Sequence, residues 1–480
     1  MLFSSYQFLI YFLPCCLLLV AVARQFGRVP SLLALLSLSL VFYSFFHPPY
    51  LLLITISIAV NYWGAELAVA YRKRSLLIAL IVFDLGLLGA FKYLGLLVGT
   101  LGRVGDIELP AINILLPLAI SFFAFQQVAY VVDRWRGDIG PSSFLNYAVF
   151  ISFFPQLIAG PIVRYQYVSG ALATNGARVS LDRFAWGVSL FVVGLAKKVL
   201  LADSFGDIAA PSFDLNEQGG SLARADAWTA LLAYSLQIYF DFSAYSDMAI
   251  GLAALFGFQL PVNFLSPYKS RSISEFWRRW HISLSEFLRD YLYIPLGGNR
   301  SGQARRLTNL MLVMLLGGLW HGADWAFLLW GGIHGGMLVF EQGFRALRTD
   351  LKYFKLLHEG LSKLAIPATF LLVTIAWVPF RANGLAWIDF YHALAFGAGN
   401  GSLGWQPAGL VALGLLVIWT LPNTMEIFAH HDHRHEVPAY QGFLRWRPSV
   451  FWLISAVLLL ILSMFIMLGG EPNEFIYFQF

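Results

Sequence analysis

The chain has 480 residues, of which 58% are hydrophobic and only 12% are charged. Soluble domains usually carry about 25% charged residues, so this composition excludes an ordinary soluble protein and indicates that lipid is the main solvent. The net charge of +5 is small and spread over the loops. This argues against nucleic-acid binding and fits the loop charges that orient membrane proteins.

Apolar stretches of about 20 residues recur along the whole chain, and each is long enough to cross a bilayer as a helix. Because the backbone must satisfy its own hydrogen bonds in lipid, we predict an all-α polytopic membrane protein with about 11–13 transmembrane helices. No polar block is long enough for a further domain, so residues 1–480 are expected to form one transmembrane domain. The predicted spans are 6–23, 31–46, 50–70, 75–98, 111–132, 144–163, 184–202, 227–256, 307–330, 332–347, 362–381, 406–428 and 449–469.

The first apolar stretch, Met1 to Val22, lacks a basic start and a small-residue cleavage site. We therefore expect a retained span and not a signal peptide. The two cysteines of the chain, Cys15 and Cys16, are adjacent within this stretch, which fits neither a disulfide framework nor a zinc site.

Three early basic clusters, Arg24/Arg28, Arg72/Lys73/Arg74 and Arg134/Arg136, lie in loops that are separated from one another by pairs of predicted spans. If the N-terminus lies outside, these loops all face the cytoplasm, as the positive-inside rule requires. The later clusters Arg300/Arg305/Arg306 and Arg345/Arg348/Lys352/Lys355 are further candidate cytoplasmic loops, because the two spans 307–330 and 332–347 separate them.

Two apolar stretches carry polar or helix-breaking residues that lipid alone does not tolerate. FFPQLIAGPIVRY should break or kink its helix at its prolines, and YFDFSAYSDMAIG places acids and hydroxyls inside a span. Such features at membrane depth are typical of segments that line protein or a water-filled cavity, so we expect a polar chamber. The residues concerned are Pro155, Gly160, Pro161, Asp241, Ser243, Ser246 and Asp247.

The stretch SISEFWRRWHISLSEFLRDYLYIPLGGNR, within residues 271–300, does not look like a span. As one helix it gathers its large apolar side chains within an arc of about 120°, with His281 at the border beside Ser285. It should lie at the interface or dip into a protein-lined cavity. One interpretation is an interfacial helix in which His281 has no chemical role; the other is a buried polar network. Its expected ion pairs are Glu275–Arg279 and Glu286–Arg289.

LLGGLWHGADWAF places His321 inside the predicted span 307–330. It could be a core histidine bonded to a carbonyl, part of an ion or proton path, or a general base. Glycines at 317, 318 and 322 flank it and would let another backbone or a substrate approach closely. Asp324 and His334 lie near it in the sequence and receive no role. The tract HHDHRHE, His430 to Glu436, favours a solvated loop over a metal site because its spacing is irregular.

Several motifs together carry a family resemblance. They are FWRRWHISLSEFLRDYLYIPLGGNR, LLGGLWHGADWAFLLWGGIHG, FFPQLIAGPIVRY, YFDFSAYSDMAIG, NFLSPYKSRSISEFW and the terminal FIYFQF. The chain resembles the membrane-bound O-acyltransferase (MBOAT) family, and within it the bacterial branch with the membrane subunit of alginate O-acetyltransferase. That family's fold surrounds a central polar chamber with spans and re-entrant or interfacial segments.

The resemblance implies two functional histidines, which match His281 and His321. His321 would be the base or acyl relay, and His281 would orient or assist it. The implied donor is acetyl-CoA or another acyl thioester on the cytoplasmic side, and basic residues around Lys269–Arg300 are candidates to attract it. No permanently bound cofactor and no metal are implied, and the residues that would bind the donor are unknown.

The resemblance further implies a bacterial inner-membrane enzyme with a periplasmic N-terminus. It would move acetyl across the membrane for O-acetylation of an exopolysaccharide, with a separate periplasmic acetyltransferase as partner. D-alanyl transfer to teichoic acid, or acetylation of peptidoglycan or cellulose, remains an alternative. The alternative from another class is a transporter or channel with His321 in a proton path, which predicts repeats that the sequence does not show.

Overall fold

The computed structural model describes residues 1–107, 109–110, 114–158, 160–174, 179–300, 302–347, 364–399, 401–429, 437–470 and 475–476. Within these ranges the regular structure is helical and no strand occurs, which confirms the all-α prediction. The histidine tract at 430–436 and the basic residues Arg348, Lys352 and Lys355 fall outside the described residues.

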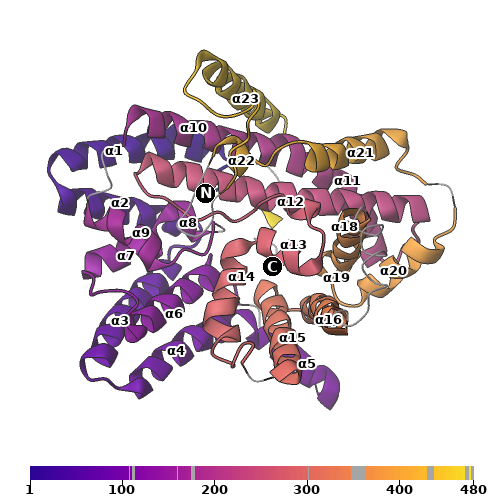
Figure 1. Cartoon of the computed structure of the whole chain (residues 1–480), viewed down its shortest axis with the longest axis horizontal. Helices are drawn as coiled ribbons and strands as arrows, with labels where there is room; N and C mark the ends of the chain where they lie inside the picture. The colour runs from indigo at the N-terminus through magenta and orange to yellow at the C-terminus, as the bar shows by residue number, and fades with distance from the viewer. Residues whose placement is uncertain are drawn as a thin grey trace.

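The N-terminal part is a group of helices, the first four of which are joined by short loops at 26–27, 45–49 and 71–73. In Figure 1, α3, α4 and α6 lie together, and α4 packs on both α3 and α6. The elements are η1 (Gln7–Phe12), α1 (Leu13–Gln25), α2 (Arg28–Ser44), α3 (Tyr50–Ala70), α4 (Arg74–Lys92), α5 (Leu94–Gly105) and α6 (Ile120–Arg136). The predicted span 75–98 is wrong at its end, because the chain turns at Tyr93, the C-cap of α4.

The middle of the chain supplies the long central helix α12, beside which α10 runs across the molecule (Figure 1). Glycines make this packing close: a Cβ on Gly194 would lie 2.8 Å from the Ala244 carbonyl oxygen. Small residues at such interfaces let helix backbones approach in membranes. The elements are α7 (Phe144–Ser152), α8 (Phe154–Leu157), α9 (Tyr165–Ala173), α10 (Leu181–Ala196), η2 (Lys197–Ala202), α11 (Asp203–Glu217) and α12 (Arg224–Leu255).

The acids predicted to sit within a span are buried in α12 and neutralised by neighbouring lysines of η2. Lys198 Nζ lies 2.9 Å from Asp241 and 2.7 Å from Asp203, and Lys197 Nζ lies 2.7 Å from Asp247. Removing charges from water is tolerated only when they are paired and hydrogen-bonded, which explains how α12 stays in the core. The predicted break of 144–163 is also confirmed, since α7 and α8 are short and an extended segment follows.

The remaining helices include the two short ones before α15 and the peripheral C-terminal helix α23. They are η3 (Pro267–Lys269), α13 (Ile273–Arg279), α14 (Ile282–Leu288), η4 (Arg289–Tyr293), α15 (Gly302–His321), α16 (Trp325–Leu347), α18 (Ala365–Ala376), α19 (Val378–Arg381), α20 (Ala386–Phe396), α21 (Trp405–Thr420), α22 (Thr424–Ile427) and α23 (Val450–Leu468). The predicted boundary between spans 307–330 and 332–347 is wrong, because the chain turns at 322–324.

Five helical segments among the described residues are long and apolar enough to cross a membrane on their own: 7–25, 50–70, 74–92, 181–217 and 450–468. The predicted spans 31–46, 362–381 and 406–428 correspond to shorter apolar helices at 28–44, 365–381 and 405–420, and a further short apolar helix covers 94–105. The chain is thus a multi-pass membrane protein in which short and broken helices fill the interior. Such helices are acceptable there because neighbouring protein satisfies their backbone ends.

Candidate active site

His281 lies in a sharp break between α13 and α14, at φ 42° and ψ 54°. The expectation of one continuous amphipathic helix from Phe276 onward is therefore wrong. A left-handed conformation at a residue other than glycine costs about 1–3 kcal/mol and persists only where the surroundings enforce it. Backbone hydrogen bonds on both sides do so here: Leu265 N donates to Arg279 O at 2.9 Å, and Ile282 N donates to Asn263 O at 3.0 Å.

Asn263 holds the imidazole of His281. Its Oδ1 lies 3.2 Å from His281 Nδ1 and also accepts from the Ser283 hydroxyl at 2.9 Å, while its Nδ2 donates to Ser246 Oγ at 3.1 Å. Because Oδ1 only accepts, Nδ1 carries the proton and Nε2 keeps its lone pair. Ser285, which the helical pattern places beside His281, takes no part in this arrangement, since its hydroxyl makes no hydrogen bond to any described residue.

His321 is the last residue of α15, and not the middle of a span as the sequence suggested. The next helix begins at Trp325, and Asp324 Oδ1 accepts from Ala326 N at 2.7 Å as a helix cap. The predicted close approach at the glycines is confirmed, because a Cβ on Gly318 would lie 3.0 Å from Gly331 Cα on α16. Asp324 therefore has a structural role near the site, as the residue that caps α16.

The fold brings the two candidate histidines together. Their ring centroids are 6.3 Å apart, and their side chains come from elements 40 residues apart in the sequence. His281 is 0% exposed and His321 is 3% exposed. His281 therefore lies in the protein interior and not at the surface of an interfacial helix.

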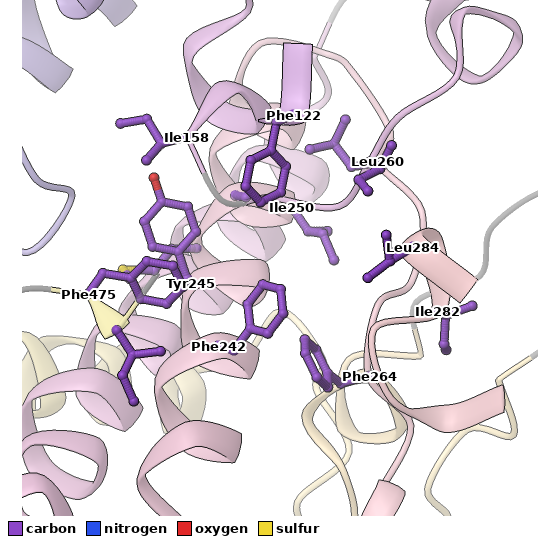
Figure 2. Close-up of a cluster of buried hydrophobic side chains, with 14 of the residues drawn as sticks. Phe122, Ile158, Phe242, Tyr245, Ile250, Leu260, Phe264, Ile282, Leu284 and Phe475 are labelled. Carbon is purple, nitrogen blue, oxygen red and sulfur yellow. The ribbon is translucent and has the colours of Figure 1, made fainter. Parts of the chain in front are cut away.

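Aromatic side chains enclose both rings. Trp330 and Phe380 contact the ring of His321 at 5.1 and 5.2 Å, and Phe242 lies edge-on to His281 at 4.6 Å. Figure 2 shows Phe242 and Phe264 in one buried hydrophobic cluster with Tyr245 and Phe475. This apolar surround excludes bulk water, and electrostatic interactions at the histidines are strengthened as a result.

A cavity of about 440 Å³ opens on the His321 side of the pair. Its wall combines residues from distant parts of the chain, among them Met1 and Phe475. The other lining residues are Leu2, Phe46, Lys92, Leu115, Leu116, Pro117, Leu118, Ala119, Ile120, Ser121, Phe122, Ile158, Trp320 and His321. Its size fits a small-molecule or chain-end substrate.

The cavity lies at one end of the N-terminal helices. Met1 precedes η1, Phe46 follows α2, Lys92 ends α4 and Ile120 begins α6. The basic clusters at 24–28, 72–74 and 134–136 occupy the opposite ends of the same helices. The cavity and the basic loops therefore face opposite sides of the helix bundle.

The two ion pairs predicted along the 272–300 stretch are present, but they do not form a buried network. Glu275–Arg279 is 2.8 Å long and Glu286–Arg289 is 3.4 Å, and the two arginine side chains are 37% and 50% exposed. Such pairs contribute about 0–1 kcal/mol each. The more buried interaction of this segment is Arg164 with Asp290, at 2.7 Å.

The other polar residues singled out from the sequence divide into two groups. Ser246 contacts the His281 loop through Asn263, whereas Asp241 and Asp247 serve in ion pairs and Ser243 bonds a carbonyl of its own helix at 3.5 Å. His334 is buried, with its ring centroid 4.8 Å from that of Trp330, which also touches His321.

Sequence analysis missed Asn263 and Lys92. Asn263 lies 18 residues before His281 in a segment without regular structure, where no periodicity marks it. Lys92 lies inside the predicted span 75–98, close enough to its end to resemble an ordinary lysine that reaches the interface. In the structure its Nζ instead donates to the carbonyl oxygens of Trp320 and His321. Within the described part of the chain, no group of three or more histidine, cysteine or acidic residues is arranged to hold a metal ion.

Comparison with known proteins gives a consistent set of relatives. A model described as MBOAT, membrane-bound O-acyltransferase family, matches residues 136–362. A probable alginate O-acetylase AlgI of Azotobacter vinelandii is 42% identical over 410 residues, covering 83% of this chain and 79% of the relative. The protein with the same description from Pseudomonas putida is 37% identical over 504 residues, 100% of both chains. A peptidoglycan O-acetyltransferase of Helicobacter pylori is 39% identical over 419 residues, covering 80% and 78%.

Proposed function

Because the chain belongs to the membrane-bound O-acyltransferase family and is an acyltransferase, we propose that it transfers acetyl from a thioester for O-acetylation of an alginate-like exopolysaccharide. The observation that carries the proposal is the pair of buried histidines, 6.3 Å apart, beside a cavity. The names of the relatives support acetyl as the acyl group and alginate as the class of polymer.

In the proposed reaction, His321 accepts the proton of an acceptor hydroxyl. The hydroxyl oxygen bonds to the acyl carbon, the carbon–sulfur bond breaks, and the proton passes to the departing thiolate. A positioned imidazole contributes about 10²–10⁴-fold to such proton transfers. His281 has its proton at Nδ1, held by Asn263, so its Nε2 lone pair can orient a substrate group or His321.

The sidedness of the proposal follows from the charges. The positive-inside rule assigns the basic ends of the helices to the cytoplasm, so Met1 and the cavity face the periplasm of a bacterial inner membrane. The donor, acetyl-CoA or another acyl thioester, would then approach from the basic face. There Arg278, Arg279 and Arg289 of the 272–300 stretch remain partly exposed and can attract an anionic donor. A periplasmic acetyltransferase would receive acetyl at the cavity.

Two measurements test this function. Acetylation of the polymer in a deletion strain should be restored by the unsubstituted chain and not by His321→Ala at equal membrane levels. Acetyl-CoA labelled in its acetyl group, added to membrane vesicles, should lose label to protein or polysaccharide. If the label stays on CoA, the alternative of a transporter or channel gains support and the transferase proposal is wrong.

A second candidate function within the family rests on the Helicobacter relative, whose printed name is peptidoglycan O-acetyltransferase. D-alanyl transfer to teichoic acid and acetylation of cellulose are the further alternatives. Identifying the acetylated polymer in the native host distinguishes these acceptors, because the same histidine pair would serve each of them.

A further inference from the structure

Lys92 is a cation buried beside the reactive histidine that the proposed reaction does not yet use. It is the last residue of α4, and only 9% of its surface is exposed. Its Nζ donates to the carbonyl oxygen of Trp320 at 2.7 Å and to that of His321 at 2.9 Å. A buried ammonium is costly unless it is hydrogen-bonded, so these two carbonyls are what hold it there.

These contacts cap the C-terminal end of α15. The last four carbonyls of a helix lack partners within the helix, and together they carry a partial negative charge. Lys92 bonds two of them, and the hydroxyl of its neighbour Tyr93 donates to a third, that of Leu319, at 2.7 Å. The end of α4 therefore fixes three consecutive carbonyls, 319–321, in the turn that carries the imidazole.

Lys92 also belongs to the cavity wall, as His321 does. An ammonium has three N–H donors, and two are used on the carbonyls. Among the described residues, Lys92 makes no further side-chain hydrogen bond. Its Nζ therefore lies where the helix end, the imidazole and the cavity meet.

We propose that Lys92 is a positioning residue for His321: its charged cap sets the orientation of the α15 end and thereby places the imidazole against the acyl group in the cavity. This inference rests on the proposed transfer function. It predicts that removing the charge at position 92 lowers activity more than removing a neutral hydrogen bond from the same helix end. A displacement of about 1 Å at a reacting group can cost about 100-fold in rate.

The test compares Lys92→Met, Lys92→Arg and the matched control Tyr93→Phe, which removes a neutral cap from the same helix end. For each, we would measure membrane level, thermal stability in detergent, and kcat and KM for acetyl-CoA. Lys92→Met should lower kcat about 100-fold with little change in KM. Lys92→Arg should recover a large part of the loss because it keeps the charge and its donors. Tyr93→Phe should lower kcat only a few-fold.

Equal losses for Lys92→Met and Tyr93→Phe, in parallel with stability, would overturn the inference and leave a purely structural cap. If Lys92→Met does not accumulate, Lys92→Gln replaces it, since glutamine keeps N–H donors without charge. Activity in Lys92→Arg and none in Lys92→Gln supports the inference, and equal activity in both overturns it. If His321→Ala loses acetyl transfer as expected but Lys92→Met is fully active, only this inference is contradicted. If His321→Ala transfers acetyl as well as the unsubstituted protein, the proposed function itself is contradicted.

Discussion

Replacing Asn263 with alanine should disable the site without touching either histidine. The change removes the acceptor of His281 Nδ1 and of the Ser283 N–H, at 3.2 and 3.3 Å, in a region closed to water. Each buried donor left unpaired costs about 1–3 kcal/mol, so we expect a loss of about 2–6 kcal/mol in folding stability. The loop can then relax from the left-handed conformation of His281, whose tautomer is no longer fixed.

Acetyl transfer by Asn263→Ala should fall about 100-fold, because the orientation of His281 is lost. The assay is label transfer from acetyl-CoA in vesicles, normalised to protein level, with the melting temperature of the purified protein measured in parallel. Ser285→Ala is the matched control: its hydroxyl makes no hydrogen bond within the described ranges, so both quantities should stay near those of the unsubstituted protein. Normal transfer by Asn263→Ala, or equal damage by Ser285→Ala, would refute the assignment of Asn263.

Three other predictions concern helix packing, the buried ion pair of Lys198 and the membrane topology. Gly318→Val should separate α15 from α16 and lower the yield of folded protein in detergent extracts, because the added side chain meets Gly331; an unchanged yield would contradict this packing. Lys198→Met should destabilise the protein by about 3–5 kcal/mol, since Asp241 is left as an unpaired buried charge, and a melting curve in detergent would measure it. A reporter active only in the periplasm should give signal when fused at residue 1 and none at 72–74, and the opposite pattern would reverse the proposed topology.

The sequence predicted the class of fold and the two histidines, but not how they are presented. Residues 307–330 are apolar almost throughout, so hydropathy alone extends the span past His321. The turn that ends α15 is followed by Asp324, which caps α16, and an aspartate two residues after Gly322 is the local signal for a new helix start. His281 was placed on a helix face because the apolar period of 276–291 continues across the break.

Residues that act through distant contacts could not be identified from local pattern. Asn263 reaches His281 only because backbone bonds align two segments that lack a shared period. Lys92 is 229 residues from His321 in the sequence. Its partners are backbone carbonyls, which every residue has, so no residue type in the sequence indicates the contact. The span count was also too simple, since helices such as α7 and α8 are buried by their neighbours and not by lipid.

We propose above that the chain moves acetyl from a cytoplasmic thioester to an acceptor on the other face, with His321 as the base for that transfer. The most direct measurement uses sealed inside-out vesicles that contain this chain, with acetyl-labelled CoA added outside and a periplasmic acceptor enclosed. Label should appear on the enclosed acceptor with the unsubstituted protein and fall about 10²–10⁴-fold with His321→Ala at equal protein level. Equal labelling of the enclosed acceptor by the two proteins would contradict the account.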